Sequence, residues 1–184
     1  MTPFDNCYPP AFDVRNTTQS KWGKDQTGII QYQFNNQGFR GDQSYNWVCD
    51  YAFFGNSAVF GIGVPFDKTM VSYFSKAHNY GLAGPYMNWH SVKNLKKFLN
   101  SALYTTNTKI IFVWIDRPGR ESVPELIDQV NQMQSGILHI SMGNKYPQSV
   151  NLMPSIDHDV SGTHPGTKSH AMWAKTIKLL LNKC

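Results

Sequence analysis

The segment Lys109–Ile115 constrains the fold most, because six apolar side chains follow one another in it, Ile-Ile-Phe-Val-Trp-Ile. A strand with one face in water alternates apolar and polar residues, whereas a continuous apolar run is typical of a strand that is covered on both faces. The run has about a third of the ~20 residues that a membrane-spanning helix needs. We therefore expect a central strand of a parallel sheet and no membrane span.

Short apolar runs and helical patterns alternate along the rest of the chain. The expected strands are Tyr51–Phe54, His78–Leu82, Lys109–Ile115 and Gly136–Met142. The expected helices are Asp67–Ala77, Trp89–Tyr104, Glu121–Gln134 and His164–Leu181. This alternation predicts an α/β fold with three layers, α/β/α, and a mostly parallel sheet of four to five strands.

Composition favours one folded domain over residues 1–184. The chain is 41% hydrophobic and 14% aromatic, which is too apolar for disorder, and its length suits a single core. Residues 1–48 are rich in Asn, Gln, Gly and Pro, and we expect them to form an irregular N-terminal arm that packs on the core. The net charge of +5 comes partly from lysines in the last helical segment, where a solvated helix face explains them more simply than an acidic partner does.

The cysteines and the first residues bear on compartment and cofactors. Cys7, Cys49 and Cys184 are odd in number and far apart, which predicts reduced thiols rather than a disulfide framework. The Cys and His positions do not have the spacing of a metal site. Residues 1–10 lack the basic and apolar regions of a signal peptide, so the expected location is cytoplasmic.

Two segments carry candidate chemistry. In an open parallel sheet the active residues gather at the carboxyl ends of the strands, and Gly55-Asn56-Ser57 follows the first predicted strand directly. A serine after a glycine turn can present its hydroxyl as a nucleophile and its own N–H as an oxyanion donor, although an ordinary capped turn has the same pattern. His164 precedes Pro165, which suits the first turn of a helix, so its imidazole is expected at the mouth of the last helix. His170 is expected within that helix, packed rather than catalytic.

Taken together, these segments resemble the SGNH hydrolases, the superfamily of GDSL-like esterases and lipases. Gly55–Ser57 with Phe60–Pro65 is similar to the block that carries the family's nucleophile, and Asn79–Gly84 is similar to the block whose last glycine donates to the oxyanion. His164–His170 resembles the block that carries the base. Upstream, Asn35–Gly41 resembles an Asn-x-x-Gly-Phe-Arg-Gly segment that precedes the catalytic domain in some members. The resemblance implies a flavodoxin-like fold and an acyl-transfer site with Ser57, Gly84 and His164.

Three positions depart from the family pattern. Asn56 stands where the family has Asp in the nucleophile block. The Asn of the third block is missing after the strand ending at Ile115, so a third oxyanion donor is either Asn88 or Arg117 or is absent. Ser161 stands where the family has the Asp that orients the histidine. Asp159 is the expected substitute, ahead of two other carboxylates, Asp157 and Asp116.

The expected function is therefore a serine ester hydrolase without metal or cofactor, acting on a small acyl ester such as an O-acetylated carbohydrate. Asn56, Tyr86, Trp89 and Arg117 are candidates for binding that substrate, although Tyr86 and Trp89 could equally pack at the start of a helix. The alternative is a weak or inactive relative that binds a carbohydrate or an acidic surface, which the missing Asp favours. Charge and aromatic content alone do not indicate nucleic-acid binding, since no recognition motif is present.

Overall fold

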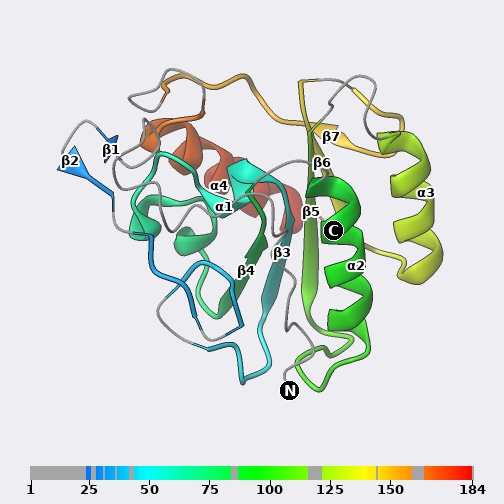
Figure 1. The fold of residues 1–184 in the computed structure, drawn as a ribbon. Coiled ribbons are helices and arrows are strands. Elements are labelled where there is room, and N and C mark those ends of the chain that lie inside the picture. The colour runs from blue at the N-terminus through cyan, green and yellow to red at the C-terminus, as the bar shows by residue number, and fades with distance from the viewer. Residues whose placement is uncertain are drawn as a thin grey trace.

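A five-stranded parallel sheet forms the centre of the computed structural model (Figure 1). The structure describes residues 24–25, 28–30, 32–35, 37–41, 44–83, 87–115, 122–143, 145–158 and 164–183. The strands of the sheet are β3 (Tyr51–Gly55), β4 (Ala77–Gly81), β5 (Lys109–Ile115), β6 (Leu138–Met142) and β7 (Val150–Asn151). They lie in the order β4-β3-β5-β6-β7, and every neighbouring pair is parallel. The predicted parallel α/β architecture is confirmed.

The order of the strands places a reversal beside β3. Counted along the chain within this sheet, the order is 2-1-3-4-5, which is the flavodoxin-like arrangement. The chain moves outward from β3 to β4 and then crosses back to β5 on the other side. In such sheets the crevice for ligands lies at the carboxyl ends of the two strands that flank the reversal. Here those strands are β3 and β5.

Helices cover both faces of the sheet (Figure 1). The main helices are α2 (Met87–Leu99), α3 (Val123–Met133) and α4 (Thr167–Leu181). Along β5, Phe112 and Trp114 pack in one core cluster with α2 and α3, while Ile111 and Val113 pack in the other with α4. A strand that supplies both cores needs apolar side chains at every position, which explains the continuous run in the sequence.

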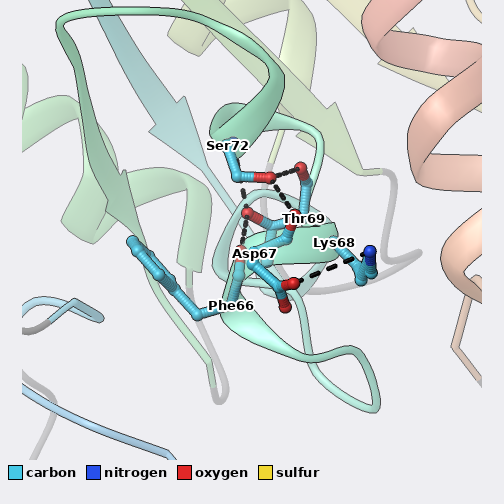
Figure 2. Close-up of polar contacts among 5 residues, drawn as sticks. All are labelled: Phe66, Asp67, Lys68, Thr69 and Ser72. Carbon is cyan, nitrogen blue, oxygen red and sulfur yellow. Dashed lines mark hydrogen bonds and ion pairs between the residues drawn. The ribbon is translucent and has the colours of Figure 1, made fainter.

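The helix predicted over residues 67–77 is wrong. Two short 3-10 helices, η2 (Phe66–Lys68) and η3 (Val71–Tyr73), lie there instead, and β4 begins at Ala77. Figure 2 shows the reason: the Thr69 hydroxyl donates to the carbonyl of Phe66, and the Ser72 hydroxyl donates to the carbonyls of Asp67 and Thr69 at 2.8 and 2.7 Å. Side chains that hydrogen-bond nearby carbonyls compete with a helix for the same backbone groups.

The other predicted elements are present with shorter or shifted ends. Helix α2 ends at Leu99 rather than at Tyr104, and α4 begins at Thr167, three residues after the expected start. The short strand β7 was not predicted. Nor was the small antiparallel pair of β1 (Lys24–Asp25) and β2 (Gly28–Ile29), which forms a separate sheet.

A tyrosine from the N-terminal segment lies against the edge strand β4. The Tyr45 hydroxyl accepts a hydrogen bond from the N–H of Asn79 at 2.9 Å and lies 3.3 Å from its carbonyl oxygen. The ring is buried and stacks on His78 with a centroid distance of 4.1 Å. One phenol thus satisfies both backbone groups of a residue on the outer strand.

Candidate functional site

The turn that follows β3 is built by three consecutive residues. Gly55 has φ of 146°, and a Cβ at that position would lie 2.4 Å from the carbonyl oxygen of Val113, so only glycine fits. The fully buried Asn56 caps the short helix α1 (Ser57–Phe60): its Oδ1 accepts from the Ala58 N–H at 2.8 Å. Its Nδ2 donates to the Val113 carbonyl at 3.1 Å. Asn56 therefore fastens the start of α1 to β5.

Ser57 is the first residue of α1 and keeps 5% of its surface exposed. The N–H of a first helical residue has no acceptor within its helix, so it can serve an external oxygen. Ser57 follows β3 at the carboxyl end of the strand beside the reversal in strand order. The structure thus places the predicted nucleophile where the fold concentrates its chemistry.

Side chains of α2 tie that helix to the same edge of the sheet. Asn88 is fully buried, and its Nδ2 donates to the Ile115 carbonyl at 2.8 Å, at the end of β5. The hydroxyl of Ser91 donates to the Gly55 carbonyl at 2.8 Å, at the end of β3. Asn88 therefore already has a structural partner, and its predicted part in the oxyanion hole would use its remaining amide proton. That part stays a prediction.

Asp157 holds the start of α4. Its carboxylate accepts hydrogen bonds from the N–H groups of Lys168 and Ser169 at 2.9 and 2.7 Å and from the Ser169 hydroxyl at 2.5 Å. Partial burial acts to raise the pKa of Asp157, but the hydrogen bonds from Ser169 and Lys168 outweigh it and the pKa is lowered. The carboxylate is thus engaged as a helix cap.

His164 lies just before α4 and is half-buried. The next residue, Pro165, forms an antiparallel bridge with His158, and the N–H of Gly166 donates to the Asp157 carbonyl at 3.0 Å. These contacts fix the entry of the chain into α4. His164 lies at the mouth of the last helix, as expected, whereas Pro165 precedes the helix instead of standing in its first turn.

His170 is packed inside the molecule, as expected. Its side chain is fully buried, and its Nδ1 accepts from the N–H of Met70 at 3.0 Å. Burial, helped by the nearby Arg40 and His164 and opposed by the charge of Asp157, lowers the pKa of His170 to about 3. His170 is therefore a neutral acceptor that joins α4 to the loop after α1.

The remaining predicted site residues divide into two groups. Trp89 is 44% exposed in the first turn of α2, and the ammonium of Lys93 lies 3.4 Å from its ring centroid, so it is not packed in the core. The others lie outside the described residues: Gly84, Tyr86, Asp116, Arg117, Asp159 and Ser161. Their predicted roles stay predictions.

Two residues that contact α1 were not predicted as functional. The Nδ2 of Asn79, on β4, donates to the Val59 carbonyl at 2.9 Å, and the guanidinium of Arg40 binds carbonyls at the end of α1. Asn79 and Arg40 both lie in segments that resemble family motifs, and that position was the available signal.

Within the described ranges, no three His, Cys, Asp or Glu side chains gather as they would around a metal ion. In the same ranges, no helix combines the length and the apolar character that crossing a bilayer requires.

Comparisons with known proteins add little. No protein-family model matches the sequence, and no curated protein matches it. A crystal structure of a member of the lipolytic protein G-D-S-L family from Veillonella parvula DSM 2008 aligns with 72% of this chain and 72% of its own, at 16% identity and a TM-score of 0.38. A match at that level assigns neither a family nor an activity to this chain.

Proposed function

We propose that the chain is a serine ester hydrolase of the SGNH type. The observation that carries this proposal is the position of Ser57, on a glycine-asparagine turn at the carboxyl end of β3, beside the reversal in strand order. The entry of His164 at the start of α4, which packs on the same face of the sheet as α1, supports it further.

The reaction would be acyl transfer. Ser57 Oγ attacks the carbonyl carbon of an ester while His164 accepts the hydroxyl proton, and the N–H groups of Ser57 and Gly84 hold the oxyanion. The tetrahedral intermediate collapses, and His164 gives the proton to the leaving alcohol. Water then attacks the acyl-enzyme by the same steps in reverse. Asp159 would orient His164 and stabilise its protonated form.

The substrate we propose is a small acyl ester, such as an O-acetylated carbohydrate. The slight exposure of Ser57 suits a short acyl group, and the exposed ring of Trp89 can stack on a sugar. Asn56, Tyr86 and Arg117 remain candidates on the substrate side, although the amide of Asn56 already binds Val113 and Ala58.

One experiment tests the activity. Hydrolysis of p-nitrophenyl acetate is measured for the wild type, Ser57→Ala and His164→Ala, with Ser135→Ala as a matched control on an exposed serine. We expect both site variants to lose at least about 10³-fold in kcat/KM, while the control keeps the wild-type rate. Equal rates for wild type and Ser57→Ala would exclude the hydrolase.

A second candidate is a binding module without turnover. It is favoured by one observation: Ser161 replaces the orienting Asp, while the carboxylate of Asp157 is engaged by Lys168 and Ser169. In that case, titration with an acetylated oligosaccharide would show binding that Trp89→Ala weakens, with no release of acetate.

A further inference from the structure

A buried arginine donates hydrogen bonds to the backbone at the end of the helix that begins with Ser57. Arg40 is 0% exposed, and its Nη1 donates to the carbonyl oxygens of Phe60, at 3.0 Å, and of Gly61. Its Nη2 donates to the carbonyl of Val64 at 2.5 Å. The rings of Tyr32 and Phe60 flank the guanidinium, with centroids 4.6 and 5.4 Å from Cζ. A single side chain thus engages three carbonyls over five residues of backbone.

One of the residues bound by Arg40, Gly61, is hydrogen-bonded directly to the candidate nucleophile. The N–H groups of Gly61 and Ile62 both donate to the carbonyl of Ser57, at 2.8 and 3.1 Å. Gly61 therefore binds Arg40 through its carbonyl and Ser57 through its N–H. Gly61 has φ of 82°, and a Cβ there would lie 2.4 Å from Thr69 Cγ2, so this turn has no freedom to carry another residue.

Arg40 completes a set of side chains that fix α1 from three elements. Asn56 fastens its first turn to β5, and Asn79 fastens the Val59 carbonyl to β4. Helix α1 has only four residues, so its own hydrogen bonds cannot hold it rigid. The last carbonyls of a helix need external donors, and the fork of a guanidinium can supply several from one fixed plane.

We propose that Arg40 is a positioning residue for the Ser57 turn, setting the place of the Ser57 Oγ and N–H through its bonds to Phe60, Gly61 and Val64. The inference rests on the proposed function for its catalytic consequence. The family resemblance of the segment Asn35–Gly41 implies no role for it, whereas the contacts of Arg40 give the segment one. Lysine cannot replace the arginine, because an ammonium is a compact group without the planar fork.

The test combines Arg40→Lys and Arg40→Met with two measurements. For p-nitrophenyl acetate we expect kcat to fall about 10- to 100-fold in both variants, with KM within about twofold, because a misplaced reacting group slows the chemical step. In amide hydrogen exchange we expect Gly61 and Ile62 to exchange at least about tenfold faster than in the wild type, while Leu95 in the buried face of α2 keeps its rate.

Tyr45→Phe is the matched control. It removes a hydroxyl that lies 3.3 Å from the Arg40 carbonyl but leaves the guanidinium contacts in place. We expect it to lower the melting temperature without changing kcat or the exchange of Gly61. A fall in kcat equal to that of Arg40→Lys would overturn the positioning role, because a general loosening of the N-terminal segment would then suffice.

The remaining outcomes are also decisive. Folded Arg40 variants with wild-type kcat and wild-type exchange at Gly61 would overturn the proposal. If Arg40→Lys and Arg40→Met both fail to fold, Arg40 is required for folding and the proposal is likewise overturned. If the wild type shows no Ser57-dependent hydrolysis, the proposed function fails by itself, and faster exchange at Gly61 and Ile62 would still establish that Arg40 holds the turn.

Discussion

The imidazole of His170 on α4 accepts a hydrogen bond from the backbone N–H of Met70, a residue 100 positions earlier in the chain. Met70 precedes η3 directly and belongs to the loop that follows α1. The bond therefore couples the helix that begins after His164 to the loop that continues from Ser57. Both partners are fully buried, so water cannot replace either of them.

We predict that His170→Leu destabilises the protein by about 2–4 kcal/mol. The change removes the acceptor and leaves the Met70 N–H buried without a partner, in addition to disturbing the packing against Trp173. Urea unfolding followed by circular dichroism measures the free energy of unfolding. Lys175→Leu on the exposed face of the same helix is the control, with an expected change within about 0.5 kcal/mol. Equal stability of His170→Leu and wild type would contradict the structural role.

Stability should decrease as the pH falls below about 6.5. Burial lowers the pKa values of His78 and His139 to about 4 and that of His170 to about 3, from an ordinary value of 6.5. Between about pH 6.5 and pH 4 the unfolded chain binds protons at these positions and the folded chain does not, so acid favours unfolding. Each histidine contributes a slope of up to about 1.4 kcal/mol per pH unit, and the contribution is fully present above pH 6.5.

The measurement for this prediction is the urea midpoint between pH 7.5 and 4.5. His139→Gln removes one titrating group, so the free energy of unfolding should depend less steeply on pH, by up to the contribution of one histidine. In the wild type the Trp114 indole N–H donates to His139 Nδ1 at 3.0 Å, and the side-chain oxygen of a glutamine can accept the same bond. A midpoint that stays constant from pH 6.5 to pH 5 would contradict the assignment of neutral buried histidines.

Asn56→Asp should destabilise this chain, although Asp is what the resembling family carries at that position. A carboxylate can accept from the Ala58 N–H but cannot donate to the Val113 carbonyl, and it would bring a charge into a fully buried site. We expect a loss of about 1–3 kcal/mol at pH 7. Asn107→Asp, at an exposed turn, should change the free energy of unfolding by less than about 0.5 kcal/mol, and equal effects of the two would refute the argument.

Asp157→Asn should affect stability rather than catalysis. Loss of the carboxylate weakens the cap on α4 by about 1–2 kcal/mol. Because the pKa of Asp157 is lowered in the folded state, its contribution is present above about pH 4 and is lost as the pH falls further. We expect a lower melting temperature at pH 7 and kcat within about twofold of wild type.

Asp159→Asn should have the opposite pattern. If Asp159 orients His164, kcat for p-nitrophenyl acetate falls by about two to four orders of magnitude with little change in melting temperature. Wild-type kcat in Asp159→Asn, together with a faster Ser161→Asp variant, would instead identify a Ser57–His164 dyad. A loss of kcat in Asp116→Asn alone would assign the role to Asp116.

The sequence predicted the elements whose signals lie in local runs. The apolar stretch through Phe112 and the period of apolar residues through Leu95 each point to one structure, because a strand or helix buries those positions in any packing. The segment around Thr69 failed, because apolar spacing suggested a helix while hydroxyls bonded to neighbouring carbonyls favour 3-10 turns. The strand β7 has two residues, too few for a periodic signal.

The candidate site was predictable only in part, for a related reason. The positions of Ser57 after β3 and of His164 before α4 follow from local patterns, while their catalytic roles stay predictions. The supports of Ser57 do not follow from such patterns, since Asn56 binds Val113, 57 residues later in sequence, and Arg40 binds Gly61, 21 residues later. Such partners are set by the tertiary fold, and for Arg40 the available signal is its place in a segment that resembles a family motif.

The phenol of Tyr45 also bears on how copies of this protein behave at high concentration. An open edge strand offers free N–H and carbonyl groups on which a second chain can add a strand, and such pairing starts aggregation. At Asn79, in the middle of β4, those groups already bind the Tyr45 hydroxyl. At the opposite edge, β7 offers only two residues of ladder. Strand addition is therefore blocked at the middle of β4, and β7 offers only a short ladder for it.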